Sequence, residues 1–391
     1  MITIAFNYID GRIWRGGHQY IFNLVSALSS FSPDRVRSII FVGTDIAVED
    51  LRVFEGIERV KVVRNQTFNS SRNNLRLFKA ILFGSDNEAL NIFLENKVDI
   101  VFESARFYGW HFPLPVLTWI PDFQHRYLKK LFGWQAYWKR EIGFRVQALS
   151  GRHIMLSSED ARGDCEKYYP ITKGRTSVVR FCAPPPKLPS IEEASRIVEV
   201  YGLPKHFFFL PNQFWAHKNH ICVIRAVSIL KKRGISVVIV CSGKQADERD
   251  PHYFEKIQRH INFNGLGDSL RLLGMIPSAH IMALMMKCAA LINPSKFEGW
   301  STTVEEAKVI GVPIILSELR VHKEQCNNAF FFDPDAPDQL ANILESFNSS
   351  THGFGDIGGG HFAEVAEINF NKFSEEFTNL IEQQVQIQRG S

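Results

Sequence analysis

Short apolar runs of strand length alternate along the chain with stretches in which apolar residues recur at helical spacing. Ile21, Leu24 and Leu28, for example, would share one face of a helix. Strands that alternate with helices form mostly parallel sheets covered by helices on both faces. The pattern therefore predicts two doubly wound α/β halves. The apolar runs lie at 2–9, 38–43, 60–64, 98–102, 115–120, 153–158 and 177–182 in the first half, and at 207–210, 237–241, 270–276, 289–292, 313–316 and 329–332 in the second.

A cluster of prolines separates the two halves. Prolines occupy 184–186 and 189, and a run of three can continue neither a strand nor a helix interior. A chain of 391 residues is also longer than the chains that usually fold around a single hydrophobic core. We therefore predict a first domain over 1–186, a second over 200–365, and a terminal helix over 366–391 that crosses back to the first domain.

Composition excludes several classes of protein. No run of about eighteen uncharged apolar residues is present, so no spanning helix is expected. The start of the chain lacks the basic and long apolar regions of a signal peptide. The net charge of +4 is too small to indicate nucleic-acid binding by itself. The 6 cysteines have no CxxC spacing and mostly lie in apolar runs. We therefore expect reduced thiols in a cytosolic protein, without a disulfide framework or a zinc site.

The strongest candidates for binding residues lie at 293–307, where an apolar run is followed by a helical pattern. Thr302 and Glu305 have the spacing of a capping box, which would let Glu306 face a ligand. The amides at this helix start would suit a phosphate. Glu298 lies eight residues before Glu306. Carboxylates that accept from hydroxyls, beside amides that donate to phosphates, suit a ligand carrying both groups. The spacing alone fits two surface carboxylates near a loop equally well.

Two further positions follow predicted strands of the first half. Gly16 and Gly17 lie between a strand and a helical pattern, a geometry that lets the backbone approach a phosphate or sugar. A plain loop is the alternative. Asp122 and His125 follow the apolar run 115–120, and open α/β sheets place ligands at such strand ends. His125 is thus a candidate polar contact or base, with a satisfied surface histidine as the alternative.

Residues 126–140 interleave aromatic and basic side chains. This pattern suits a helix at a membrane surface. It also suits an ordinary amphipathic helix with solvated lysines, which is the interpretation that we favour.

Residues 353–358 match the Gly-x-Gly-x-x-Gly dinucleotide fingerprint. That fingerprint follows a strand and opens the helix of a βαβ unit. Here no predicted strand precedes it and the surrounding stretch is rich in Gly, Ser and Asn. We interpret the match as accidental.

The segment around the two glutamates resembles the signature of retaining glycosyltransferases of family GT4, the glycosyl transferases group 1 family. The resemblance covers both halves. It implies a GT-B fold, in which two doubly wound Rossmann-like domains face each other across a cleft. The matching motifs, in family order, are Gly16-Gly17, His217-Lys218-Asn219, Asn293-Pro-Ser, Glu298-x7-Glu306, Gly311-Val-Pro313 and Asp333-Pro334.

The resemblance also implies roles for these residues. Glu306 would accept hydrogen bonds from the donor ribose, Glu298 would lie by the transferred sugar, and Lys218 would neutralise the diphosphate leaving group. A fixed cation and amides stabilise negative charge where it develops. The remaining donor-side candidates are the amides of Gly299, Trp300, Ser301 and Thr302, which would contact the sugar and phosphates, and Gly16 and Gly17, which would close the cleft.

The chain departs from the family pattern at two places. Many members carry an Arg about six residues before the loop lysine, where this chain has Asn212. Lys218 would then work with less positive charge or with help from His217. Many members also have a His before the Asp at the end of the acceptor-side strand. Here a proline precedes Asp122 and His125 follows it, and the acceptor-side catalytic role is assigned to these two residues.

The resemblance thus predicts a retaining, metal-independent hexosyltransferase without a cofactor. Its donor would be a UDP- or GDP-linked sugar and its acceptor a saccharide or lipid-linked saccharide, in polysaccharide or O-antigen-type assembly. We expect it in the cytoplasm, without a nucleic-acid partner. Peripheral contact with the inner membrane face through 126–140 is the alternative to the ordinary helix that we favour there. The alternatives are a nucleotide-sugar epimerase or a phosphorylase of the same fold, and a non-catalytic nucleotide-sugar-binding protein. The chain is short for a phosphorylase, which also needs a pyridoxal lysine.

Overall fold

A computed structural model describes residues 1–104, 106–185, 187–349 and 359–390. The chain divides into two compact units. The first unit comprises Met1–Phe123, Trp138–Pro184 and Glu367–Ser391, and the second comprises Gln124–Tyr137 and Pro185–Ala366.

The first unit is built on a seven-stranded parallel sheet with the order β3-β2-β1-β4-β5-β6-β7. All the strands predicted for the first half are present, as buried apolar runs of a parallel sheet should be. Their bounds are β1 Ile2–Asn7, β2 Val36–Val42, β3 Val60–Arg64, β4 Ile100–Ser104, β5 Val116–Trp119, β6 His153–Leu156 and β7 Thr176–Val178.

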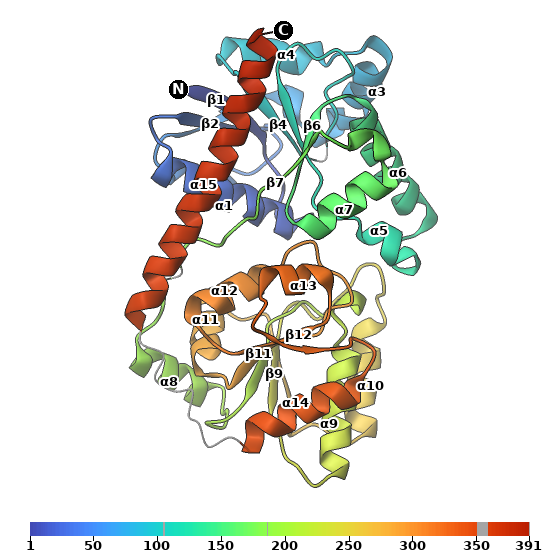
Figure 1. The fold of residues 1–391 in the computed structure, drawn as a ribbon, viewed down its shortest axis with the longest axis vertical. Helices are drawn as coiled ribbons and strands as arrows, with labels where there is room; N and C mark the ends of the chain where they lie inside the picture. The colour runs from blue at the N-terminus through green and yellow to red at the C-terminus, as the bar shows by residue number, and fades with distance from the viewer. Residues whose placement is uncertain (105, 186, 350–358, 391) are drawn as a thin grey trace. The chain divides into compact units, whose positions relative to one another are not determined.

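Helices pack on this sheet (Figure 1). The final helix belongs to this unit from Glu367 onward, and its Phe377 ring contacts the rings of Phe6 and Phe102 in the sheet. The α-helices in or beside this unit are α1 Arg15–Phe31, α2 Arg52–Glu55, α3 Asn73–Phe83, α4 Asn87–Glu95, α6 Trp134–Leu149, α7 Glu159–Tyr168 and α15 Gly359–Gly390.

The second unit has a six-stranded parallel sheet with the order β10-β9-β8-β11-β12-β13. The predicted strands of the second half are all present here as well. They are β8 Phe208–Leu210, β9 Ile239–Ser242, β10 Leu270–Gly274, β11 Ala290–Asn293, β12 Ile314–Ser317 and β13 Phe330–Phe332. The strand order reverses between β8 and β11, and doubly wound sheets bind ligands beyond the carboxyl ends of strands at such a point.

Two helical layers cover the second sheet (Figure 1). Successive side chains of a strand face opposite ways, so Phe208 joins one core and Phe209 the other. One core includes α9 His220–Lys232, α10 Tyr253–Phe263 and α14 Pro337–Ser349, and the other includes α8 Ile191–Val200, α11 Ser278–Lys287 and α12 Thr302–Ile310. Two short helices, α5 Gln124–Tyr127 and α13 Arg320–Gln325, complete the α-helices assigned to this unit.

Two sequence interpretations need comment. The single amphipathic helix expected over 126–140 is wrong, because the structure has α5, a 3-10 turn at Lys129–Leu131 and then α6 from Trp134. Gly133 lies at the break, where a residue of low helix propensity favours an interruption. The dinucleotide-like match at 353–358 lies outside the described residues.

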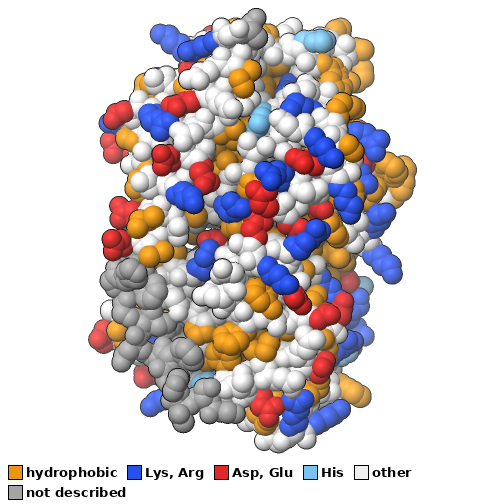
Figure 2. Space-filling model, in the orientation of Figure 1, with side chains coloured by type: hydrophobic (Ala, Val, Ile, Leu, Met, Phe, Trp, Pro, Cys, Tyr) orange, Lys and Arg blue, Asp and Glu red, His pale blue; other side chains and the backbone are white. Residues whose placement is uncertain are grey.

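Surface features bear on the expected partners. Lys and Arg are interspersed with Asp and Glu over most of the face in Figure 2, rather than forming one continuous basic surface there. Among the helices that the structure describes, none is long and apolar enough to cross a bilayer.

Candidate functional site

Lys218 is held by a short loop between β8 and α9. The loop contains a 3-10 turn at Ala216–Lys218, and Asn219 follows in a left-handed conformation with φ 57°. Asparagine tolerates this conformation better than most residues. The Asn219 side chain donates to the carbonyls of Pro294 at 3.1 Å and Pro334 at 2.8 Å. These bonds fix Lys218 to the loop that follows β11.

Glu298, from the loop after β11, pairs directly with Lys218. Lys218 Nζ lies 2.5 Å from Glu298 Oε1, and the side chains are only 13% and 9% exposed. Burial is the largest single effect and raises the pKa of Glu298, but the charge and hydrogen bond of Lys218, together with His322 and His217, lower it by more in sum, so that the net pKa is about 2. Glu298 is therefore ionised at neutral pH and can accept hydrogen bonds without supplying a proton. The pair occupies the point where the strand order reverses.

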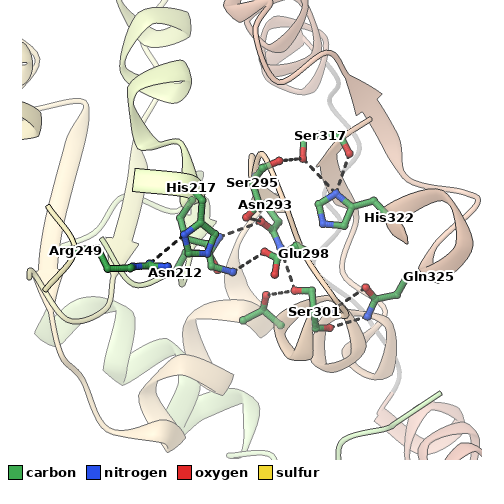
Figure 3. Close-up of polar contacts among 12 residues, drawn as sticks. Asn212, His217, Arg249, Asn293, Ser295, Glu298, Ser301, Ser317, His322 and Gln325 are labelled. Atoms are coloured by element: carbon green, nitrogen blue, oxygen red, sulfur yellow. Dashed lines mark hydrogen bonds and ion pairs between the residues drawn. The ribbon is translucent and has the colours of Figure 1, made fainter. Parts of the chain in front are cut away.

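Buried side-chain hydrogen bonds join the ends of the two strands that precede the loops of the pair (Figure 3). The Asn293 side-chain oxygen accepts from Asn212 Nδ2 at 3.1 Å and from Ser295 Oγ at 2.7 Å. Asn293 Nδ2 donates to Ser301 Oγ at 3.0 Å. Asn212 is thus a structural support that joins the ends of β8 and β11, and its neutral side chain cannot replace a cation.

The start of α12 differs from the sequence expectation. Ser301, rather than Thr302, is the N-cap residue, and no side chain caps the helix. Glu305 instead accepts from Gln325 Nε2 at 2.8 Å and from Lys308. The predicted capping box is therefore wrong, because a tertiary partner binds the glutamate. The Gln325 amide also donates to the carbonyl of Ser301 at 2.7 Å and accepts its N–H at 3.2 Å.

The remaining donor-side candidates of this segment lie around that helix start. Gly299 and Trp300 are partly buried in the loop between Glu298 and the N-cap. Thr302 opens α12, and Glu306 lies half-buried one turn further on. One loop and one helix start therefore carry the whole segment that the sequence singled out.

His217 is a buried neighbour of Lys218. Burial, followed by the charge of Lys218, lowers its pKa to about 3, so the imidazole is neutral at physiological pH. Its Nδ1 lies 3.3 Å from Arg249 Nη2 and, since Arg only donates, acts as an acceptor. His217 therefore adds no positive charge beside Lys218.

Arg249 is a cation that the sequence analysis missed. It lies in the loop after β9, and its Nε donates to Asp247 Oδ1 at 3.1 Å. The other oxygen of Asp247 accepts the Ala216 N–H at 3.1 Å. This carboxylate therefore links Arg249 to the loop of Lys218. The only sequence signal was a basic residue beyond the end of a strand adjacent to β8.

Asp122 and His125 are assigned to different units. Asp122 belongs to the first unit, where a carboxylate oxygen lies 3.7 Å from Arg140 Nη1. His125 belongs to the second unit and is fully buried against the rings of Phe132 and Tyr137. The segment of His125 contacts the candidate site, because Arg249 Nη1 donates to Gln124 Oε1 at 3.1 Å.

Gly16 and Gly17 lie in the first turn of α1, rather than in the preceding loop. A Cβ on Gly17 would overlap the ring of Trp14. Trp14 in turn stacks on Trp119, at the end of β5, with 5.4 Å between ring centroids. The absence of a side chain at Gly17 therefore lets this aromatic stack form over the helix start.

A comparison with models of protein families gives a match in the second half of the chain. Residues 192–351 match the family model of the glycosyl transferases group 1. This segment is similar to that family. The match includes Lys218, Glu298 and Glu306, so it confirms the resemblance on which the site was predicted. A comparison with curated proteins gives no match.

Three solved structures show the fold of the whole chain. A glycosyltransferase from Rickettsia africae ESF-5 has 16% identity and a TM-score of 0.69, covering 100% of this chain and 99% of that chain. HepE from Anabaena, in complex with UDP and glucose, has 16% identity and a TM-score of 0.70, covering 98% and 100%. WaaG, a glycosyltransferase involved in lipopolysaccharide biosynthesis, has 13% identity and a TM-score of 0.59, covering 100% of both chains. With the two parallel sheets, these similarities confirm the GT-B fold.

Proposed function

We propose that the protein is a retaining glycosyltransferase that uses a UDP- or GDP-linked sugar, without a metal. The observation that carries this proposal is the Lys218–Glu298 pair at the strand-order reversal of a group 1 family segment. Lys218 offers positive charge where the diphosphate leaves, and Glu298 offers an ionised acceptor for sugar hydroxyls. The proposed acceptor is a saccharide or lipid-linked saccharide, in polysaccharide assembly.

Arg249 supplies the second cation in this proposal. A departing diphosphate carries more negative charge than one ammonium can balance, and Lys218 already faces Glu298. The guanidinium of Arg249 contacts one carboxylate, Asp247, while two of its other nitrogens contact the neutral side chains of His217 and Gln124. Arg249 therefore retains charge to offer a phosphate, whereas the neutral His217 does not.

The first unit contributes the acceptor side in this proposal. Asp122 is partly exposed and is the residue that would contact an acceptor hydroxyl, whereas His125 is fully buried beside Phe132 and Tyr137. The helix start at Gly16 and Gly17 offers backbone amides without bulky side chains.

Nucleotide binding tests this proposal directly. HepE crystallised with UDP and glucose, so UDP-glucose is the first donor to try, beside GDP-mannose. A nucleotide that binds only the folded protein raises the melting temperature by mass action. Glu306→Ala should weaken UDP or GDP binding by about 10- to 100-fold, because a ribose hydroxyl loses a charged acceptor. Calorimetry measures the affinity, and the exposed Glu193→Ala on α8 is the control. Unchanged nucleotide affinity in Glu306→Ala would contradict the ribose role.

Turnover separates the alternatives. The proposed transferase releases UDP or GDP only when a suitable acceptor is supplied, and it should do so in the presence of a chelator. An epimerase converts the nucleotide sugar with no acceptor present. A binding protein forms a tight nucleotide complex without turnover against a broad acceptor panel.

Peripheral membrane contact through 126–140 is a second part of the proposal. Lys129 and Lys130 are exposed and Trp134 is 75% exposed, so a basic and aromatic surface remains although the segment is not one helix. Anionic lipid attracts such a surface by about 1 kcal/mol per lysine. Lys129→Glu/Lys130→Glu should reduce co-sedimentation with anionic liposomes, but not with neutral ones. Equal binding by the wild type and the double variant would rule this contact out.

A further inference from the structure

His322 is a buried histidine beside the candidate site that the sequence analysis did not single out. It lies in α13, just after β12, and its side chain has no exposed surface. His322 Nδ1 is 2.8 Å from the backbone carbonyl of Ser317. A carbonyl oxygen only accepts, so Nδ1 carries the hydrogen. Burial lowers the pKa of His322, so the ring is neutral and Nε2 bears a lone pair.

No residue that the structure describes donates a hydrogen bond to that lone pair. Nε2 of His322 is buried and has no hydrogen-bond partner among the residues that the structure describes. Buried polar atoms in native proteins nearly always have a partner, so an orphan needs an explanation. Figure 3 shows Nδ1 turned to Ser317 and the other ring nitrogen turned toward the side of Glu298. The charge of Glu298 also acts on His322, and so places the ring within electrostatic reach of the pair.

The chemistry of this corner restricts the ligand group that it can hold. Glu298 is an ionised carboxylate and His322 Nε2 is a neutral acceptor, so both seek hydrogen-bond donors. A phosphate would be repelled by Glu298, and a cation would be repelled by Lys218, which lies 2.5 Å from Glu298. A neutral group with several donors fits both acceptors, and adjacent sugar hydroxyls are such a group.

We propose that Nε2 of His322 accepts a hydrogen bond from a hydroxyl of the transferred sugar, while a neighbouring hydroxyl of that sugar donates to Glu298. This inference rests on the proposed function and deepens it. It restricts the donor to sugars that carry a donor group at the position facing His322, and it excludes the matching deoxysugars. A site built to pair a hydroxyl rejects an analogue that lacks it, because the buried acceptor then stays unpaired.

Three substitutions of His322 distinguish the role of Nδ1 from the role of Nε2. His322→Phe keeps the ring shape and removes both nitrogens. His322→Asn can keep a donor near Nδ1 but has no acceptor near Nε2, whereas His322→Gln can place its amide oxygen near Nε2. Calorimetry with UDP and with UDP-glucose, or with GDP and GDP-mannose if those bind, reports the sugar contribution separately from the nucleotide contribution.

We expect His322→Phe and His322→Asn to bind the sugar nucleotide about 10-fold more weakly, with the affinity for the bare nucleotide unchanged within about 2-fold. His322→Gln should recover most of the lost affinity. Monodeoxy analogues of the sugar should identify one position that the wild type penalises and His322→Phe does not. The exposed His252→Phe is the matched control and should change neither affinity.

Two results would overturn the inference. Equal weakening of bare nucleotide and sugar nucleotide, with a lowered melting temperature, would mean that His322 only supports the fold. No change in either affinity would mean that Nε2 meets no sugar. By contrast, a wild-type protein that binds no UDP- or GDP-linked sugar would refute the proposed function itself, and this inference with it.

Discussion

Replacing Lys218 with Ala is expected to lower kcat/KM for glycosyl transfer by about 100- to 1000-fold, the usual effect of removing a preorganised charge from a developing anion. Lys218 is the cation that contacts Glu298, and its loop is fixed by two side-chain bonds of Asn219. Because the leaving diphosphate gains charge in the transition state, most of the loss should fall on kcat. Steady-state kinetics with the donor and acceptor found by screening would measure it.

A matched control and a rescue distinguish this role from a loss of folding. Lys205→Ala removes an exposed lysine of the same unit and should leave kcat/KM within about 2-fold of wild type, as distant surface changes usually do. Lys218→Arg keeps the charge with altered geometry, and so should recover part of the rate. A folded Lys218→Ala protein with nearly wild-type kcat would remove Lys218 from the mechanism.

The strands of both units could be predicted because each one is a continuous apolar run in the local sequence. Runs such as Phe207 to Leu210 are apolar at every position, since both faces of a doubly wound sheet are covered. The prolines after Ala183 coincide with the end of one segment of the first unit at Pro184, but the chain also leaves that unit between Phe123 and Trp138, which no local signal indicated. Local sequence was enough wherever a residue's environment depends on its near neighbours.

The details of the site depended on partners distant in sequence. The expected capping box failed because Gln325, 20 residues beyond Glu305, takes that carboxylate and holds Ser301 as well. Arg249 and His322 could not be predicted for the same reason. Each follows a different strand, and only the fold brings Arg249 to His217, next to Lys218, and His322 within reach of the charge of Glu298. The sequence could name the carboxylates and the lysine, but not the residues that orient and supplement them.

Glu298→Gln is expected to change how stability depends on acid. The ordinary glutamate pKa of 4.5 falls to about 2 in the fold, since burial raises it but Lys218, with smaller effects of His322 and His217, lowers it by more in sum. A lowered pKa stabilises the folded protein fully above the ordinary value, and this contribution disappears as the pH falls toward the folded value. The full contribution is at most about 3 kcal/mol, of which roughly 1 kcal/mol should be lost between pH 7 and about pH 3.5.

Urea unfolding of the wild type and Glu298→Gln at several pH values measures this effect. The wild type should be the more stable protein at pH 7, because glutamine leaves the largely buried Lys218 without its anion. The difference in the free energy of unfolding should then narrow as the pH falls below about 4.5, whereas an exposed control, Glu193→Gln, should show little change. A difference in unfolding free energy that stays constant or widens in acid would mean that Glu298 is not held ionised by Lys218.

The low pKa of Glu298 also bears on the pH dependence of catalysis. It requires that no step in kcat/KM between about pH 5 and 8 arises from Glu298. A step in this range that Glu298→Gln abolishes would contradict the assignment of Glu298 as a permanent acceptor.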